Sequence, residues 1–331
     1  MLDPLLKPIA KGDFGYREAA HLLNRAAFGG SSAQIQLMAD WGPDQAVEHL
    51  VRFTKTTYPQ PQAEDFQSDI MAPATPEQQL AIRKARQAGN EAVLEQVRKS
   101  RQDRQRRDRR QIRSLQQWWL TRLIETDRPL EEKMTLFLHG HFATGYRTIE
   151  NSYHMYLQNQ LFRTHATGNF ADLCFQIIRD PAMLAYLDNN ESNKNHPNEN
   201  LARELMELFT LGEGNAYTEH DIKEGARALT GYSFHGNGFV MLRGIHDGGS
   251  KQILGRRGVF NGDDFVRIIL GRIECSEYIC YKLYRYFVSD MPEGPTREQQ
   301  RFIMAARPAA SHITIRVGTG PGDDLQVAPL L

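Results

Sequence analysis

The chain has 331 residues, of which 40 are Lys or Arg and 40 are Asp or Glu, so its formal net charge is zero. A neutral chain has no overall field that would attract nucleic acid or an anionic membrane, so any electrostatic partner must be bound by a local patch. Hydrophobic residues make up 40% and charged residues 24%, which excludes general disorder, and no apolar run approaches the ~18 residues that would span a bilayer. The composition predicts a soluble, globular protein.

Cysteine usage and the first residues bear on where the protein resides. The three cysteines, Cys174, Cys275 and Cys280, are odd in number and lie in apolar segments, which is typical of buried thiols in a reducing compartment. The tract Met1 to Ala10 has no basic region followed by an apolar stretch, so we expect no signal peptide. Both features predict a cytoplasmic protein.

Three short helices are predicted in the first fifty residues. Apolar residues at helical spacing run from Tyr16 to Phe28 and end at a Gly-Gly pair. A capping-box pattern at Ser31 and a proline at position 43 mark the starts of the second and third helices. Prolines and polar residues then dominate over 57–73, which indicates a surface excursion.

The most unusual tract is a long, arginine-rich helix. A Thr cap followed by Pro and Gln over 75–78 predicts its start, and Gly89 predicts a bend. The tract 98–113 holds nine Lys or Arg against two Asp, a net charge of +7, and no apolar residue lies between positions 97 and 112. Such a helix has no stripe to bury, so we predict an exposed helical arm over about residues 76–115.

Two uses of this arm are open, nucleic-acid binding or a solvated spacer. Nucleic-acid-binding segments commonly place aromatic residues among the basic ones, and this tract has none. The zero net charge of the chain also argues against DNA or RNA. We therefore expect no nucleic-acid partner for the arm.

The remainder of the chain is predicted to be mainly helical. A long polar loop rich in Asn is expected over Asp188–Asn200, and the glycine-rich tract 231–260 predicts a small β-hairpin or an irregular insert. The fold class is therefore mainly α, a multi-helix orthogonal or bundle-like globule, with residues 1–295 as a single helical domain. Further helices are expected at Pro129–Gly140, Tyr153–His165, Phe170–Arg179, Pro181–Leu187, Asn198–Leu211, Thr218–Leu229, Phe265–Leu270 and Tyr278–Val288.

Several tracts, spread from Ala19 to Asp290, look like those of a known family. They are His21–Gly29, Glu132–Thr144, Asn198–Gly212, His246–Asp247, Asn261–Asp264 and Lys282–Val288. In this order they resemble the bacterial proteins grouped as domain of unknown function 1800. The resemblance implies a mostly helical fold and implies no activity, because the family has none assigned. Many relatives look exported and lie beside sulfatase-like neighbours, whereas the first residues of this chain predict no leader.

The chain departs from this family near its C-terminus. Relatives continue with further helices, whereas here the last predicted helix is broken by Pro308. The tract 311–331 has no helical period, so we expect 296–331 to be a degenerate or disordered tail of a chain that is truncated or read out of frame near Phe302. We expect this tail to be mobile, and the helices before it to expose apolar surface that favours self-association.

The helix after the Asn-rich loop has the most informative polar face. Leucines at positions 201, 205, 208 and 211 occupy one face, while Asn200, Arg203, Glu204 and Glu207 gather on another. One interpretation is a solvated face with an ion pair between Arg203 and Glu207. The other is a face that lines a cleft, in which Glu204 and Glu207 act as oxygen ligands or a base and Arg203 holds an anion.

Histidines supply the other candidate ligands. His139 and His141 flank Gly140, so their imidazoles converge if the backbone is extended and diverge by about 200° if it is helical. One interpretation is that they bind a divalent metal ion, with His246 as a third imidazole and Asp247 as a supporting carboxylate. The other is a pair of histidines hydrogen-bonded to backbone and carboxylates.

These candidates define one testable site. We expect His139 and His141 to lie in the same pocket as Glu204 and Glu207, because polar residues concentrate there beside otherwise apolar helices. His21, on the first buried helix, is expected to be a core histidine whose hydrogen bonds are satisfied.

Two functions from different classes follow from these residues. The first is a helical enzyme, or the remnant of one, with a His/carboxylate metal centre that performs either hydrolase or oxidoreductase chemistry. The second is a non-catalytic helical module that docks a protein partner through the Arg-rich arm or the Asn-rich loop. The sequence contains no nucleophile-elbow, phosphate-loop or dinucleotide-binding motif that would favour another class.

Overall fold

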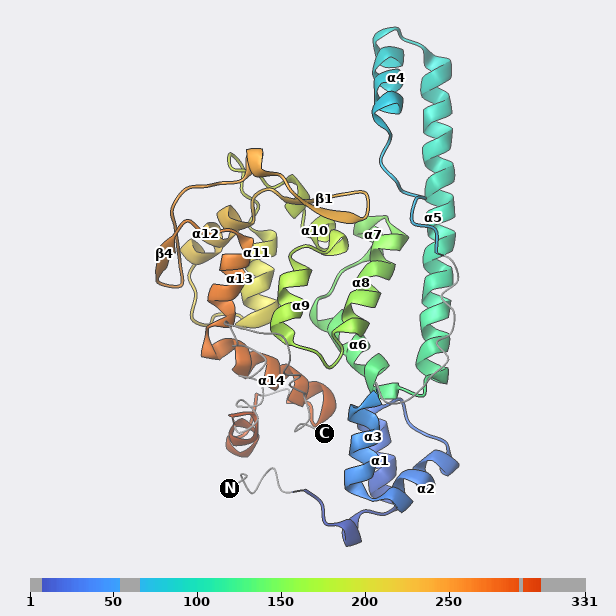
Figure 1. Cartoon of the computed structure of the whole chain (residues 1–331), viewed down its shortest axis with the longest axis vertical. Coiled ribbons are helices and arrows are strands. Elements are labelled where there is room, and N and C mark those ends of the chain that lie inside the picture. The colour runs from blue at the N-terminus through green and yellow to red at the C-terminus, as the bar shows by residue number, and fades with distance from the viewer. Residues whose placement is uncertain (1–7, 54–65, 292–293, 305–331) are drawn as a thin grey trace.

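The computed structural model describes residues 8–53, 66–291 and 294–304, and these are mainly helical (Figure 1). The three predicted N-terminal helices are present. Ser31 and Gln34 form the expected capping box, in which each side chain accepts from the other residue's backbone N–H. Pro43 is the first residue of the third helix, where its missing N–H costs nothing. A short 3-10 turn precedes them, so the order is η2 (Lys11–Asp13), α1 (Tyr16–Ala26), α2 (Ser32–Trp41) and α3 (Pro43–Val51).

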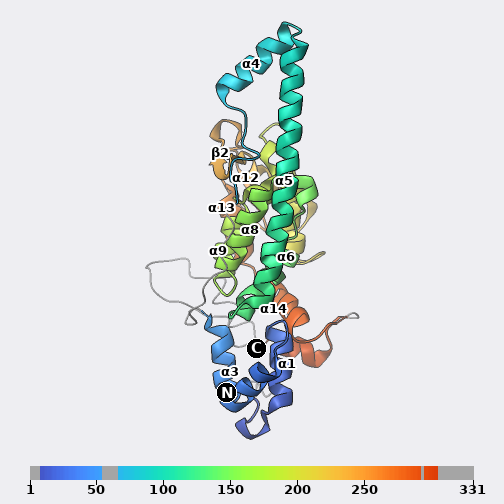
Figure 2. The same cartoon turned by 90° about the vertical axis from the view of Figure 1, so that its right-hand side faces the viewer.

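The arginine-rich arm is a pair of helices rather than one bent helix. The helices α4 (Pro76–Gln87) and α5 (Glu91–Glu125) lie side by side, and their joined ends project beyond the rest of the molecule in both views (Figure 1 and Figure 2). Gly89 lies between them at φ +60°, a left-handed conformation that glycine adopts without strain. The predicted bend is therefore a reversal of the chain.

The C-terminal half of α5 packs against the body. Ile112, Leu115 and Trp118 are buried there and contact partly buried aromatic residues. The main cluster of buried apolar side chains includes residues from Phe14 to Ile303, so helices from both ends of the described chain share it. The helices that follow α5 are α6 (Pro129–His141), α7 (Tyr146–Ile149), α8 (Ser152–Thr164), α9 (Phe170–Ile177) and α10 (Pro181–Tyr186).

The helix predicted after the Asn-rich loop changes type part-way. It is α-helical over Asn200–Glu204 (α11) and a π-helix over Leu205–Thr210 (η5). A π-helix is wider than an α-helix and is rare, so the spacing of side chains along this tract departs from the 3.6-residue period used for the prediction. The other elements of this part are η4 (Asn189–Glu191), α12 (Glu219–Leu229), α13 (Gly262–Leu270) and α14 (Ile273–Phe287), the last beginning earlier than predicted.

The glycine-rich tract forms two small antiparallel hairpins, which confirms the predicted β insert. In the first, Tyr232 pairs with Met241 and His235 with Gly238. In the second, Lys251 pairs with Gly258. The elements are β1 (Tyr232–His235), β2 (Gly238–Met241), η6 (Arg243–Ile245), β3 (Lys251–Ile253) and β4 (Arg256–Gly258).

The predictions for cysteine and for His21 have different outcomes. Cys174, Cys275 and Cys280 are all buried and unpaired, as expected, and burial raises the pKa of Cys275 to about 12. The prediction that His21 is a core residue is wrong, because His21 lies on the exposed side of α1. The core side of α1 is formed by small and apolar residues, chiefly Ala19, Leu23 and Ala26.

Some expectations fall on residues that the structure leaves undescribed. These include most of the surface excursion, at 54–65, and the tail from residue 305 onward. Within the described ranges, no helix combines the length and the hydrophobicity that crossing a membrane requires.

Candidate functional site

His139 and His141 point in different directions because the backbone between them is helical. His139 lies between the rings of Trp119 and Phe162, and its Nε2 is 3.0 Å from Nδ2 of Asn159. His141 is turned toward η5, with its Nε2 2.9 Å from the carbonyl oxygen of Phe209. Burial lowers the pKa of His139 to about 4 and that of His141 to about 3, so both rings are neutral at pH 7.

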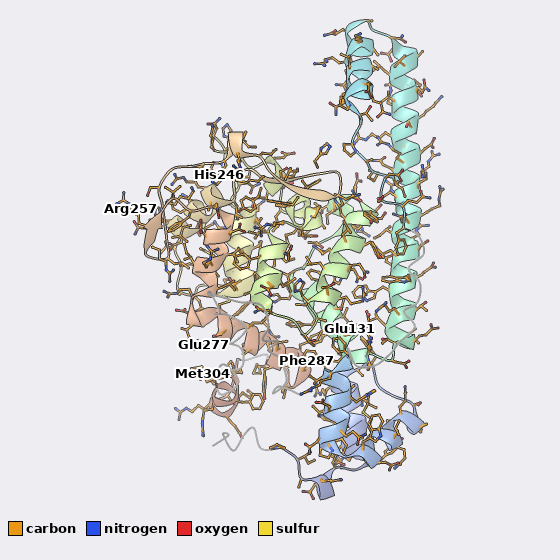
Figure 3. All side chains as sticks on the ribbon, viewed as in Figure 1. Glu131, His246, Arg257, Glu277, Phe287 and Met304 are labelled. Carbon is orange, nitrogen blue, oxygen red and sulfur yellow. The ribbon has the colours of Figure 1, made fainter. Side chains whose placement is uncertain are left out.

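His246 and Asp247 are each engaged separately. Nδ1 of His246 is 2.8 Å from the carbonyl oxygen of Thr230, which fixes the ring beside the hairpins. Asp247 accepts a hydrogen bond of 2.7 Å from Arg227, and this bond lowers the pKa of Asp247 to about 2. Figure 3 shows His246 beside the hairpins, well separated from Glu131 near the start of α6.

Arg203 is the centre of the polar face on α11. Its guanidinium lies 3.1 Å from Glu199, 3.2 Å from Glu207 and 2.8 Å from Glu219. The predicted Arg203–Glu207 ion pair is therefore present, together with two further carboxylates. Glu204 lies beside this network, and its pKa is raised by burial and by the charge of Glu207. The arrangement fits the interpretation of a half-exposed helix face stabilised by ion pairs.

In the structure, each of the predicted metal ligands has different contact partners. His139 and His141 contact different elements, His246 lies at the hairpins, and Glu207 is paired with Arg203. Across residues 8–53, 66–291 and 294–304, no three His, Cys, Asp or Glu side chains gather closely enough to hold a metal ion. Metal binding by these residues stays a prediction.

Sequence reasoning missed a buried charge cluster centred on Glu132. This carboxylate is fully buried and accepts hydrogen bonds from Arg122, from Arg163 at 2.7 Å and from Trp119 at 3.0 Å. It therefore joins α5, α6 and α8. Glu131, its neighbour, has a pKa raised by burial and by the charge of Glu132. The only signal in the sequence was two adjacent glutamates in the first turn of a helix, a pattern that is also typical of a helix N-terminus.

A second missed contact anchors the arm. Asp108 is 2% exposed and accepts hydrogen bonds from the Ser152 N–H at 2.9 Å, the Ser152 hydroxyl at 2.6 Å and the Tyr146 hydroxyl at 2.8 Å. The expectation of an exposed helical arm is therefore wrong at this position. The reason is that a helix without apolar residues can still pack through a carboxylate whose hydrogen bonds are satisfied.

The other side of α5 is exposed and basic. Lys99 and Arg106 have side chains 71% and 69% exposed, and their nearest carboxylates are 3.9 Å and 3.6 Å away. Arg110 and Arg113 are exposed and form no ion pair with any described residue. We call Lys99, Arg106, Arg110 and Arg113 the basic row, because they lie about 140–180° around the helix from Asp108.

In the Asn-rich loop, in contrast, several asparagine side chains are engaged in hydrogen bonds to the backbone. Asn189 is buried and donates to the carbonyl oxygens of Leu229 and Tyr232 at 3.2 Å and 3.0 Å. The side chain of Asn193 accepts from backbone N–H groups within the loop, and that of Asn198 accepts from the N–H of Asn200. These amides stabilise the loop, which leaves fewer of them available to a partner.

The comparisons with known proteins give one result. The sequence model of a single family, described as "Protein of unknown function (DUF1800)", matches residues 21–306, which is well over half of the chain. The chain belongs to this family. No curated protein and no solved structure matches it significantly. The match confirms the resemblance found in the sequence, and it gives no support to the expected truncation near Phe302.

In this DUF1800 protein, the tract Glu132–Thr144 that contributed to the resemblance forms α6 and the turn after it. Two of its polar side chains make internal contacts, since Glu132 joins three helices and His141 binds the backbone of η5. A tract that identifies the family is thus used here for packing. Exposed arginines without an ion pair to a described residue lie elsewhere, and they include Arg110 and Arg113 on α5 and Arg17 and Arg25 on α1.

Proposed function

We propose that this DUF1800 protein is a non-catalytic binding module whose arm docks an acidic surface of a protein partner. The observation that supports the proposal is the basic row on α5. It places four cations along one side of a single helix, and two of them, Arg110 and Arg113, have no ion pair with a described residue. At 1.5 Å per residue, the row extends over about 21 Å.

The base of the arm holds this row in a fixed orientation. Asp108 attaches α5 to the start of α8, and Glu132 attaches it to α6 further along. A helix that is already ordered loses little conformational freedom when it binds, so its charges act as a preorganised surface. The row faces away from both anchors, because Asp108 points into the body.

The residues of the arm favour a protein partner over the alternatives. Val93 and Val97 of the arm are partly buried where α4 and α5 meet, Leu80 of α4 is exposed, and none of the three lies on the basic row. That row has no aromatic side chain to stack on bases. The exposed apolar side chains on the same face of α5, Leu120 and Ile124, lie about two turns or more beyond its last arginine. Guanidinium groups pair with carboxylates through two parallel hydrogen bonds, which suits an acidic protein surface.

Binding of labelled poly-L-glutamate to the full chain tests the proposal. We expect saturable binding that weakens with salt, and a loss of at least about tenfold in affinity for the double variant Arg110→Glu/Arg113→Glu. The matched control is Arg256→Glu/Arg257→Glu, which reverses two exposed arginines on β4, away from the arm (Figure 3). The control should bind as the unchanged chain does.

Three results would overturn the proposal. Equal loss in both double variants would show a general charge effect. Tighter binding of duplex RNA than of poly-L-glutamate in the same buffer would assign the arm to nucleic acid. Tighter binding to vesicles of anionic phospholipid would assign it to a membrane.

The enzyme hypothesis, a hydrolase or oxidoreductase with a His/carboxylate metal centre, has less support. Its ligands His139, His141 and His246 are engaged in separate contacts, and Glu204 and Glu207 belong to the surface network of Arg203. Elemental analysis of protein purified without a histidine tag is the direct measurement, and a stoichiometric divalent metal would favour the enzyme over the binding module.

A further inference from the structure

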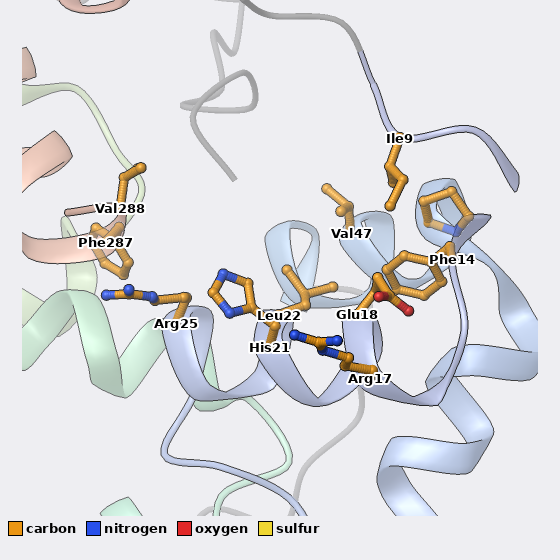
Figure 4. Close-up of a pocket in the computed structure, with 11 residues that line it drawn as sticks. Ile9, Phe14, Arg17, Glu18, His21, Leu22, Arg25, Val47, Phe287 and Val288 are labelled. Carbon is orange, nitrogen blue, oxygen red and sulfur yellow. The ribbon is translucent and has the colours of Figure 1, made fainter. Parts of the chain in front are cut away.

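A cavity of about 520 Å³ lies between α1, α3 and the end of α14 (Figure 4). The helices α1 and α3 are at the opposite end of the molecule from the arm tip (Figure 1). The size of the cavity falls within the range of small-molecule sites. The walls are mostly apolar, with Phe14, Leu22 and Val47 on the N-terminal side and Phe287 and Val288 from α14. Such walls favour an apolar ligand body, since each methylene removed from water contributes to affinity.

One side of the cavity is lined by a row of basic side chains on α1. Arg17, His21 and Arg25 follow one another at four-residue spacing, so they form a line about 12 Å long on one face of the helix. All three are exposed, and neither arginine has a carboxylate within ion-pair distance among the described residues. In Figure 4 the three side chains lie beside Leu22, between Phe14 and Phe287.

The charges around this row are unbalanced. Glu18 is the one carboxylate among the described residues that line the cavity, and it accepts a hydrogen bond of 3.1 Å from the Gly15 N–H as part of the helix cap. Lys133 lies next to Arg25, with its ammonium 4.9 Å from the ring centre of Phe28. Burial lowers the pKa of Lys133, and the charge of Arg25 lowers it further. Cations thus outnumber carboxylates on this side of the cavity, which favours an anion.

We propose that this cavity binds a small amphiphilic carboxylate of the fatty-acid type. Its aliphatic chain lies against the apolar walls, and its carboxylate lies beside His21, where the charges of Arg25 and Arg17 attract it. The ligand combines the two properties that the cavity shows, an apolar interior and a line of unpaired cations along one edge. A polymeric acidic partner would match the cations but would leave the apolar walls uncovered.

Two tracts far apart in the sequence form this site. His21, Leu22 and Arg25 belong to the first tract of the family resemblance, and Phe287 and Val288 belong to the last. The first tract supplies His21 and Arg25, and the last closes the apolar wall, while Arg17 lies on α1 one turn before the first tract. It is independent of the arm, so failure of one proposal leaves the other standing.

Isothermal titration of the full chain with dodecanoate, below its micellar concentration, tests the proposal. We expect one molecule to bind per chain. Dodecan-1-ol, which has the same chain without the charge, should bind at least about tenfold more weakly. The double variant Arg17→Gln/Arg25→Gln should bind dodecanoate no more tightly than dodecan-1-ol, and its affinity for dodecan-1-ol should be unchanged. The variant Arg17→Lys/Arg25→Lys should keep most of the preference for dodecanoate.

The controls separate binding from folding. Arg17 and Arg25 are exposed, so the glutamine variant should unfold at the same urea concentration as the unchanged chain. Arg256→Gln/Arg257→Gln removes two charges elsewhere and should bind dodecanoate normally. Val47→Trp, which introduces an indole into the cavity, should weaken both ligands.

Three outcomes would overturn the proposal. The first is the absence of saturable dodecanoate binding. The second is equal affinity for dodecanoate and dodecan-1-ol. The third is self-association of the chain through this cavity, detected as a dimer in sedimentation that Arg17→Gln/Arg25→Gln abolishes, because a second copy would then be the occupant.

Discussion

Arginine has opposite roles at two positions in the C-terminal half of α5. Arg122 is 2% exposed and is fixed between Glu131 and Glu132. Arg113, about two and a half turns earlier on the same helix, is exposed and has no ion pair with a described residue. The difference is burial, because a charge removed from water must be paired, whereas an exposed guanidinium is hydrated and remains available to a partner.

This comparison separates structural charges from binding charges. The buried group of Arg122, Arg163 and Glu132 joins α5 to α6 and α8, and both guanidinium groups also lie within 6 Å of the ring centre of Trp118, at 5.8 Å and 5.3 Å. The basic row contributes no such contact. Substitutions in the buried group should therefore change stability, and those in the row should change only binding.

The largest effect is expected from Glu132→Gln. Two buried guanidinium groups would lose their shared carboxylate, and breaking a buried ion pair costs about 3–5 kcal/mol of the free energy of unfolding. Urea denaturation measures this change. Glu95→Gln is the matched control, because Glu95 pairs with Arg98 and Lys99 at an exposed site and should cost less than about 0.5 kcal/mol. A loss below about 1 kcal/mol for Glu132→Gln would mean that the cluster is not a structural element.

The pH dependence of this effect has a definite sign. Burial alone would raise the pKa of Glu132, but the hydrogen bonds and charges of Arg163 and Arg122 outweigh it and lower the pKa. A carboxyl whose pKa is lower in the folded state stabilises the fold above its unfolded pKa of about 4.5 and loses that contribution as the pH falls further. The difference between the unchanged chain and Glu132→Gln should therefore be full at pH 7 and shrink below pH 4.5.

A smaller loss is expected from Asp108→Ala. The change removes the acceptor of three hydrogen bonds from Ser152 and Tyr146, at a site where water cannot easily replace it, and should cost about 2–3 kcal/mol. Asp103→Ala, one helical turn and a residue earlier but exposed, is the control and should cost less than about 0.5 kcal/mol. Equal costs for both would show that α5 is not anchored through Asp108.

The sequence was sufficient for most of the fold. Caps and breakers such as Ser31, Pro43 and Gly89 act within a few residues, so helix starts and turns were predicted from local patterns. The direction of the chain after Gly89 was not predicted, because a glycine can mark either a bend within one helix or a reversal between two helices. The π-helix at Leu205–Thr210 was missed as well, because its cause is packing rather than a local motif.

The candidate site was harder to predict, because a polar residue does not reveal its partner. The side chains of His139 and His141 would converge only if the backbone between them were extended. The helix α6 includes both residues, so the two side chains diverge. Asp108 and Glu132 looked like ordinary helix-surface residues, and their roles depend on groups that are 44 and 31 positions away. Long-range pairing of this kind is set by the tertiary fold.

The smallest effect on the free energy of unfolding is expected from substitutions in the basic row, where the effect on poly-L-glutamate binding is largest. Arg110 lies one turn from Arg106 and from Arg113, and like charges at this spacing destabilise a helix by a few tenths of a kcal/mol. Arg110→Gln/Arg113→Gln should therefore leave the free energy of unfolding unchanged or raise it by up to about 0.5 kcal/mol, while weakening poly-L-glutamate binding. The same repulsion implies that the unchanged chain gains a little stability as salt screens it, and that the variant gains less. A loss of more than about 1 kcal/mol would show that these arginines hold the arm in place, which would remove the distinction between structural and binding charges on α5.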